Sequence, residues 1–182
     1  MNHPFSSILR ERRGRYFWPL VVFTVLIMLT LNLAGIPLTT DAAPAGIVSY
    51  EFAGNVTGAE KILASWDNVA RERAAFVQGL DFLFIPFYAG AIALGCLMAL
   101  GVLLDRGWGL ASVGVPLAWL VFLAGLLDVV ENIALVVMLF DMPANPWPQI
   151  AYWCAAPKFI FVVLGILYSV LGAVVHLFVR KK

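Results

Sequence analysis

The chain has 182 residues, of which 62% are hydrophobic and only 13% are charged. This composition is too apolar for a soluble domain of that length, and it predicts an integral membrane protein. The net charge of +1 says little as a total. Short basic segments stand at the two ends of the chain, where membrane orientation already explains them, so we expect no nucleic-acid partner.

Four segments reach the ~20 apolar residues that cross a bilayer as a helix. We therefore predict an all-α membrane protein, a four-transmembrane-helix bundle that forms one membrane domain over residues 1–182. The first apolar run is longer than the ~7–15 residues of a signal-peptide core, so we interpret it as a retained helix. The expected spans are residues 17–36, 80–104, 113–140 and 150–179.

Basic residues predict the orientation. The segment before the first span has four arginines and one glutamate, a charge of +3, and residues 180–182 add another +3. The loop of residues 37–79 has three basic and five acidic residues, a charge of −2. Because basic residues favour the cytoplasmic side, we expect both termini in the cytoplasm and this loop outside.

The 37–79 loop is predicted to be a partly helical extracytoplasmic cap. Thr57–Glu60 has the form of a capping box at the start of a helix, and Asp67 is placed to cap a second helix that continues into span two. We expect residues 47–78 to lie as a mostly helical lid on the outer membrane surface, with Trp66 at headgroup level.

The third span carries the strongest functional signal. Its sequence GLLDVVENIAL places Asp128, Glu131 and Asn132 on one helical face, with the small residues Ala124 and Gly125 one turn earlier. Polar groups are costly at this depth, normally face the protein interior and often mark a functional site.

Spans two and four carry polar residues at similar depth. Asp81 and Tyr88 share a face of span two, and Lys158 in span four lies ~12 Å inside the outer loop, close to the ~15 Å depth of Glu131. We expect Glu131 and Lys158 to pair directly or through a ligand. Both spans also carry rows of small residues suited to close helix contact, namely Ala91, Gly95 and Ala99, and Gly165, Ser169 and Gly172.

These polar groups are predicted to line one outward-facing pocket. Ionised Asp81, Asp128, Glu131 and Lys158 together carry −2, which protons, a bound cation or water must relieve in a low dielectric. Asn32 in span one is expected at the same depth. The predicted ligand-binding residues are Asp81, Tyr88, Asp128, Glu131, Asn132, Lys158, Glu51 and Trp66.

Structural explanations compete with a binding site. The span-three cluster is also consistent with hydrogen bonds that only hold helices together. If Pro157 begins the core of span four, the Lys158 ammonium can instead reach the outer interface. Asp81 is close enough to the outer boundary to be an interfacial carboxylate.

Several kinds of cofactor and catalytic site are not expected, because the residues that they require are missing from the sequence. With only His3 and His176 near the chain ends, a bis-histidine haem is not expected, and no ExxH pair indicates a di-iron bundle. No hydrolase, zinc-protease or nucleotide-binding motif is present. Cys96 and Cys154 form no CxxC motif and are interpreted as inert thiols. We predict no cofactor, metal or catalytic residue.

Four short patterns stand out along the chain. They are YEFAG at Tyr50–Gly54, GLDFLFIPFYA at Gly79–Ala89, GLLDVVEN at Gly125–Asn132 and PKF at Pro157–Phe159. Together they resemble an uncharacterised group of small bacterial four-span membrane proteins. The resemblance implies a bacterial inner membrane and a compact protein without a soluble domain, and it implies no activity or ligand.

Three functions are consistent with these features. The favoured one is binding of a lipid, a small amphiphile or a cation in the outward pocket, with proton coupling as a further feature. The second is an accessory or structural subunit of a larger membrane complex. The third is a membrane enzyme that acts on a lipid-like substrate through a carboxylate acid or base, with Lys158 as electrostatic partner. Because four spans are few for a transporter, transport would require a homo-oligomer.

The orientation is tested with two single cysteines in a background without native cysteines, Glu60→Cys and Lys182→Cys. We expect an impermeant thiol reagent to label position 60 in cells whose outer face is accessible, and position 182 only after the membrane is permeabilised. Labelling of position 182 from outside would contradict the predicted orientation.

Overall fold

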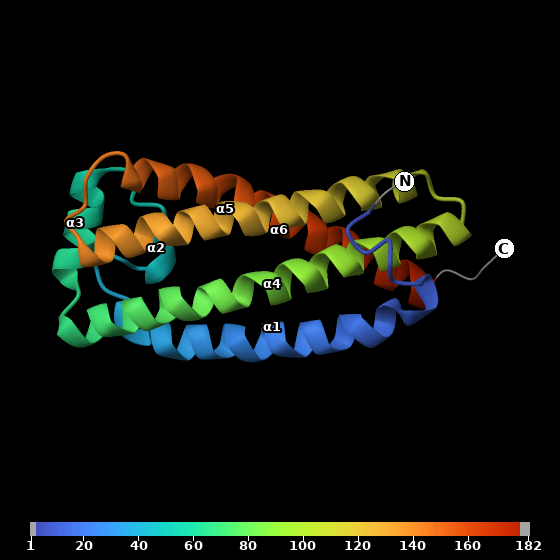
Figure 1. The fold of residues 1–182 in the computed structure, drawn as a ribbon, viewed down its shortest axis with the longest axis horizontal. Helices are drawn as coiled ribbons and strands as arrows, with labels where there is room; N and C mark the ends of the chain where they lie inside the picture. Colours follow the sequence, from blue (N-terminus) through green and yellow to red (C-terminus); the bar gives the residue numbers. More distant parts are fainter. Residues whose placement is uncertain (1–2, 179–182) are drawn as a thin grey trace. The chain divides into compact units, whose positions relative to one another are not determined.

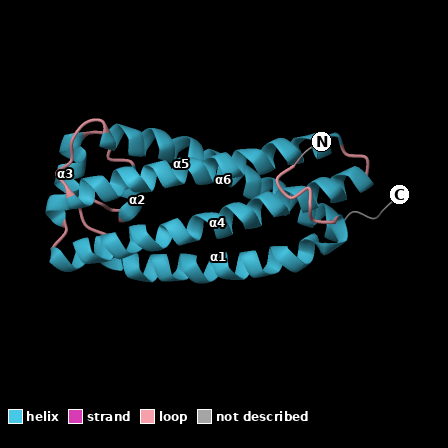
Figure 2. Cartoon of the chain, in the orientation of Figure 1, coloured by secondary structure: helices cyan, strands magenta, loops and turns pink. Residues whose placement is uncertain are grey.

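The computed structural model describes residues 3–178, which are helical apart from connecting turns and contain no strand (Figures 1 and 2). Val179 and the basic residues 180–182, on which the orientation partly rests, lie outside the described residues. Four helices are long: α1 (Arg13–Gly35), α4 (Asn68–Asp105), α5 (Gly114–Phe140) and α6 (Trp147–Phe178). The shorter elements are α2 (Ile47–Glu51), α3 (Val56–Ser65) and the 3₁₀ turns η1 (Arg10–Arg12), η2 (Ile36–Leu38) and η3 (Gly109–Val113).

The prediction of four apolar helices of membrane-spanning length is confirmed. Helix α4 begins twelve residues before the predicted span, and its 38 residues extend about 57 Å, nearly twice the hydrocarbon thickness of a bilayer. Pro157 lies well inside α6, which begins at Trp147, so this proline does not begin the helix.

The chain forms two compact units, each containing a part of every long helix. We call Val25–Ile85 with Leu126–Pro157 the cap unit, because it contains α2 and α3. The terminal unit comprises the described parts of Met1–Thr24, Pro86–Gly125 and Lys158–Lys182.

The cap unit has a core built around two aromatic residues. Tyr50 and Trp66 are in edge-to-face contact, with ring centroids 5.3 Å apart. The Trp66 indole nitrogen donates to the Leu38 carbonyl at 2.9 Å, and the side chain is only 3% exposed. The Trp66 ring is therefore enclosed in the core of the cap unit, and its expected level at the lipid headgroups stays a prediction. The core also includes Ala34, Ala59, Ile62, Leu63, Ala70, Ala74, Val77, Ala134, Leu135, Met138 and Ala151.

Side-chain caps begin the helices of the lid. The predicted cap at Asp67 is confirmed, because its carboxylate accepts from the Ala70 amide at 2.8 Å just before α4 begins. The capping box predicted at Thr57–Glu60 is displaced, since α3 begins two residues earlier. There Asn55 is the N-cap and accepts from the Gly58 amide at 2.8 Å.

In the terminal unit, the predicted rows of small residues on α4 and α6 pack against each other. A Cβ atom added to Gly172 would lie 2.5 Å from the Ala99 Cα, and one added to Gly95 would lie 2.8 Å from the Ser169 hydroxyl. Only a missing side chain permits this approach of two helix backbones, which is how small residues support helix packing in membranes.

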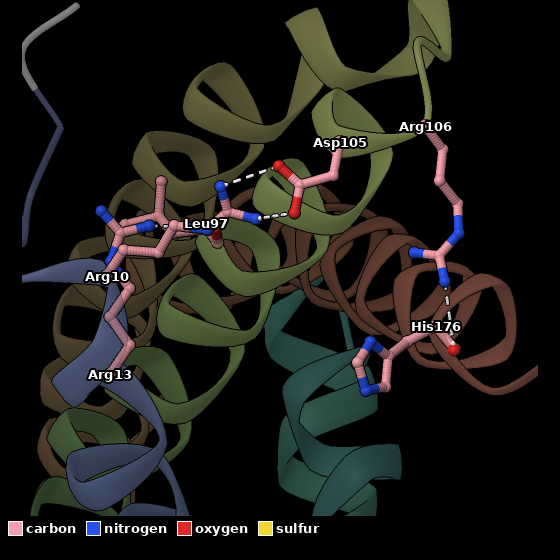
Figure 3. A network of polar contacts seen from close by, with 6 residues as sticks. All are labelled: Arg10, Arg13, Leu97, Asp105, Arg106 and His176. Carbon is pink, nitrogen blue, oxygen red and sulfur yellow. Dashed lines mark hydrogen bonds and ion pairs between the residues drawn. The ribbon is translucent and has the colours of Figure 1, made fainter. Parts of the chain in front are cut away.

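Arginines connect the loops and ends of the terminal unit (Figure 3). Arg10 forms a two-point ion pair with Asp105, at 2.7 and 3.0 Å. The buried Arg13 guanidinium donates to the Leu97 carbonyl at 3.1 Å, and Arg106 donates to the His176 carbonyl at 3.2 Å. These contacts attach the start of α1 and the end of α6 to α4 and the turn that follows it.

Two glycine substitutions test the close helix contact. We expect Gly172→Ala to lower the free energy of unfolding by about 1–3 kcal/mol, because the new methyl group meets backbone that cannot move aside. Gly79→Ala is the matched control: Gly79 lies within α4 with nothing within 4 Å of an added Cβ. That change should be neutral or stabilise the helix by up to ~1 kcal/mol. Thermal unfolding in detergent, followed by circular dichroism, measures both, and equal effects would contradict the packing.

Candidate functional site

The predicted cluster on α5 is buried in the cap unit. Glu131 is 0% exposed and Asn132 is 2% exposed, and Asp128 one turn away is also buried. The sequence of α5 explains this placement, because apolar residues surround the three polar ones and the helical repeat keeps them on one face. Two carboxylates are thus held within the apolar part of a candidate membrane span.

A hydrogen bond connects this cluster to α4. The Asn132 amide nitrogen donates to an Asp81 carboxylate oxygen at 2.5 Å. This contact brings together two of the predicted site residues from different helices. It fixes the level at which α4 and α5 meet in the cap unit.

Gln78 belongs to the same region and was not predicted. It lies three residues before Asp81 on the same face of α4, is only 2% exposed, and its amide nitrogen has no hydrogen-bond partner within residues 3–178. A buried donor without an acceptor is costly unless another group meets it. A polar residue three positions before Asp81, inside an apolar run, was the signal that could have identified it.

The lid packs onto the helices beside the cluster. The Tyr50 hydroxyl donates to the Leu135 carbonyl of α5 at 3.5 Å, and the Phe52 and Tyr152 rings meet edge-to-face at 5.7 Å. Burial raises the pKa of the Tyr50 phenol, so it remains a proton donor at neutral pH. Glu51, next to Tyr50, is buried as well.

Two predicted site residues belong to the terminal unit. Tyr88 and Lys158 are both buried, and the Lys158 ammonium lies 4.8 Å from the centre of the Phe159 ring. With 6% of its surface exposed, Lys158 does not match the alternative in which its ammonium reaches an outer interface. The expected pairing of Glu131 with Lys158 stays a prediction.

Asn32 does not join the buried residues. Its side chain is exposed and donates to the Met28 carbonyl of its own helix at 2.7 Å. The expectation that Asn32 lines the pocket is therefore wrong: the amide is satisfied locally on an outward face of α1.

The buried and half-buried charges of the cap unit are acidic. The cap unit holds four carboxylates that are buried or half-buried, those of Glu51, Asp81, Asp128 and Glu131. All three basic residues of this unit, Lys61, Arg71 and Arg73, are exposed. Even when the positive charge of Lys158 is counted against these acids, four ionised carboxylates leave a charge of −3.

The donor set does not resemble a metal site. Within residues 3–178, no group of three or more histidine, cysteine, aspartate or glutamate residues is placed to hold a metal ion.

Comparisons of the chain with protein-family models, with curated proteins and with solved structures gave no match.

A double-mutant cycle tests the Asp81–Asn132 contact. We expect Asn132→Ala to destabilise the protein by about 1.5–3 kcal/mol, because a hydrogen bond to a carboxylate is lost inside the bundle. Combined with Asp81→Ala, it should give a coupling energy of about 0.5–3 kcal/mol. Asn32→Ala is the control and should change stability by less than ~0.5 kcal/mol. Additive effects of the two cluster mutations in thermal unfolding would show that the contact contributes nothing.

Proposed function

We propose that this multi-pass membrane protein binds a small amphiphilic cation at the buried acidic cluster of the cap unit and exchanges protons for it. The proposed site consists of Asp128, Glu131 and Asn132 on α5, Asp81 and Gln78 on α4, and Glu51 under the lid. In this proposal the protein lies in a bacterial inner membrane with both termini in the cytoplasm and the site toward the outer side.

The imbalance of buried charge is the observation that carries the proposal. Within the cap unit, four carboxylates sit at buried or half-buried positions, whereas all three basic residues of that unit are exposed. Charges of one sign cannot accumulate in a low dielectric without protons, counter-ions or water. A site with this surplus favours positively charged ligands and releases protons when such a ligand binds.

The surroundings favour an amphiphile over a bare metal ion. The acids are not grouped as metal ligands, whereas apolar side chains of α4 and α5 surround them. A cation whose charge is spread over an apolar body loses little hydration when it enters the site. Such a ligand can contact both the carboxylates and the apolar side chains around them. The Gln78 amide nitrogen, a donor without a partner within residues 3–178, can meet an acceptor on the body of such a ligand.

The lid supports a site that opens outward. The α2 helix and the segment that follows it pack on α5 and α6 through Tyr50 and Phe52, and they contribute the buried Glu51. Burial of a carboxylate beneath a lid, next to helices that carry others, is consistent with an entrance controlled by the cap.

Titration with tetraphenylphosphonium tests this function. The full-length protein in nanodiscs of zwitterionic lipid is titrated by calorimetry in buffers of different ionisation enthalpy, which reports affinity and proton release together. We expect the wild-type protein to bind this cation with release of protons. Glu131→Gln should weaken binding about tenfold or more, equivalent to ~1.4 kcal/mol or more.

Glu60→Gln is the matched control, since Glu60 is an exposed acid of the same unit. It should leave affinity and proton release unchanged. If Glu131→Gln does not fold, Asp128→Asn replaces it in the comparison. Equal binding by the cluster variant and by Glu60→Gln, or no binding by the wild type, would overturn the proposal.

A further inference from the structure

A groove with a volume of about 530 Å³ lies on the cap unit, apart from the acidic cluster. It is formed by the last turns of α1, the η2 turn and the second and third turns of α4. None of the predicted site residues lines it. Its walls are Thr30, Leu33, Ala34, Ile36, Pro37, Arg73 and Phe76.

Most of the groove is apolar and open. Leu33, Ile36 and Phe76 are large hydrophobic residues that remain exposed in the folded chain. The Thr30 hydroxyl already donates to the Leu26 carbonyl at 3.0 Å, so it presents no free donor to the groove. The groove wall therefore offers apolar contact along its length and one charged group.

Arg73 supplies that charge. Its side chain is exposed and makes no hydrogen bond or ion pair with any residue of the range 3–178. Neighbours at helical spacing on α4 are Val69, Ala70, Phe76 and Val77, none of which is acidic. By contrast, the nearby Arg71 is already held by the Leu63 carbonyl at 2.8 Å.

The position of Arg73 matches the depth of lipid phosphates. It lies seven residues before the predicted start of the apolar span, about 10 Å along the helix, and the headgroup layer flanks the hydrocarbon core at this level. Along their helices, Leu33 and Phe76 lie about one turn closer to the middle of the apolar spans than Ile36 and Arg73 do. The Arg73 guanidinium is thus at the outer end of an apolar groove.

We propose that this groove binds one anionic phospholipid, with its phosphate at Arg73 and an acyl chain along Leu33 and Phe76. An arginine guanidinium can donate two parallel hydrogen bonds to phosphate oxygens. Exposed hydrophobic residues on a membrane helix contact the acyl chains of lipids. A free phosphate would use only the arginine and leave the apolar wall uncovered. The membrane lipid uses both parts of the groove.

Native mass spectrometry of the full-length protein with added lipid measures this binding. The probes are a phosphatidylglycerol and a phosphatidylcholine with the same acyl chains. We expect preferential retention of phosphatidylglycerol, and Arg73→Gln should weaken it about tenfold, as for loss of a charge-assisted hydrogen bond. Inorganic phosphate should not compete, because it cannot occupy the apolar wall.

Lys61→Gln is the matched control, because it removes an exposed positive charge from the same unit outside the groove. It should keep the preference for phosphatidylglycerol, and Phe76→Ala should weaken both lipids. Circular dichroism confirms that each variant is folded. Equal retention of the two lipids, equal loss with Lys61→Gln, or a dimer that dissociates with Arg73→Gln would each overturn the proposal. The last result would assign the groove to a second copy of the chain.

Discussion

The fold must accommodate several carboxylates within apolar helices. Glu131 is fully enclosed and Asp128 and Asn132 are nearly so, although a carboxylate taken out of water loses several kcal/mol of hydration. The surrounding structure supplies part of the compensation, most visibly in the amide of Asn132 directed at Asp81. An exact register of α4 against α5 is needed for this contact, so the polar cluster and the packing of the cap unit depend on each other.

In both units the helices are held by close packing and hydrogen bonds. Such contacts suit a membrane, where hydrophobic association between helices is weak. In the terminal unit, the missing side chain at Gly172 allows backbone to approach backbone, and the one at Gly95 leaves room for the Ser169 side chain. Arginines attach the chain ends. In the cap unit, Tyr50 and Trp66 pack edge-to-face against each other, and each donates a hydrogen bond to a backbone carbonyl. The lid is thereby integrated into the core of its unit.

Hydropathy and helical spacing predict the larger features well. Four long apolar segments have one low-energy solution in a bilayer, and a repeat of 3.6 residues places polar residues of one helix on a common face. The helix cap at Asp67 could also be predicted, because its carboxylate accepts from a backbone amide only three residues further along the chain. Such features depend only on neighbours in the chain.

Features that depend on distant contacts were harder to predict. The burial of Trp66 was not predicted, because its hydrogen-bond partner, the Leu38 carbonyl, cannot be identified from the sequence. Asn32 has the depth of the cluster, yet its face is set by how α1 packs, and it satisfies its amide on its own helix. Gln78 was missed because a single amide near an expected boundary resembles surface. Residue type and expected depth restrict which residues could belong to the buried cluster, and the packing of the helices decides which of them do.

We propose that protons or a bound cation balance the buried acids of the cap unit, and infrared difference spectroscopy can measure this balance. The reconstituted protein is recorded at neutral pH before and after addition of tetraphenylphosphonium. A protonated carboxyl group should give a band that disappears as the cation binds, and this band should be absent from Glu131→Gln. A spectrum without such a band, unchanged by the cation, would contradict the proposed proton exchange.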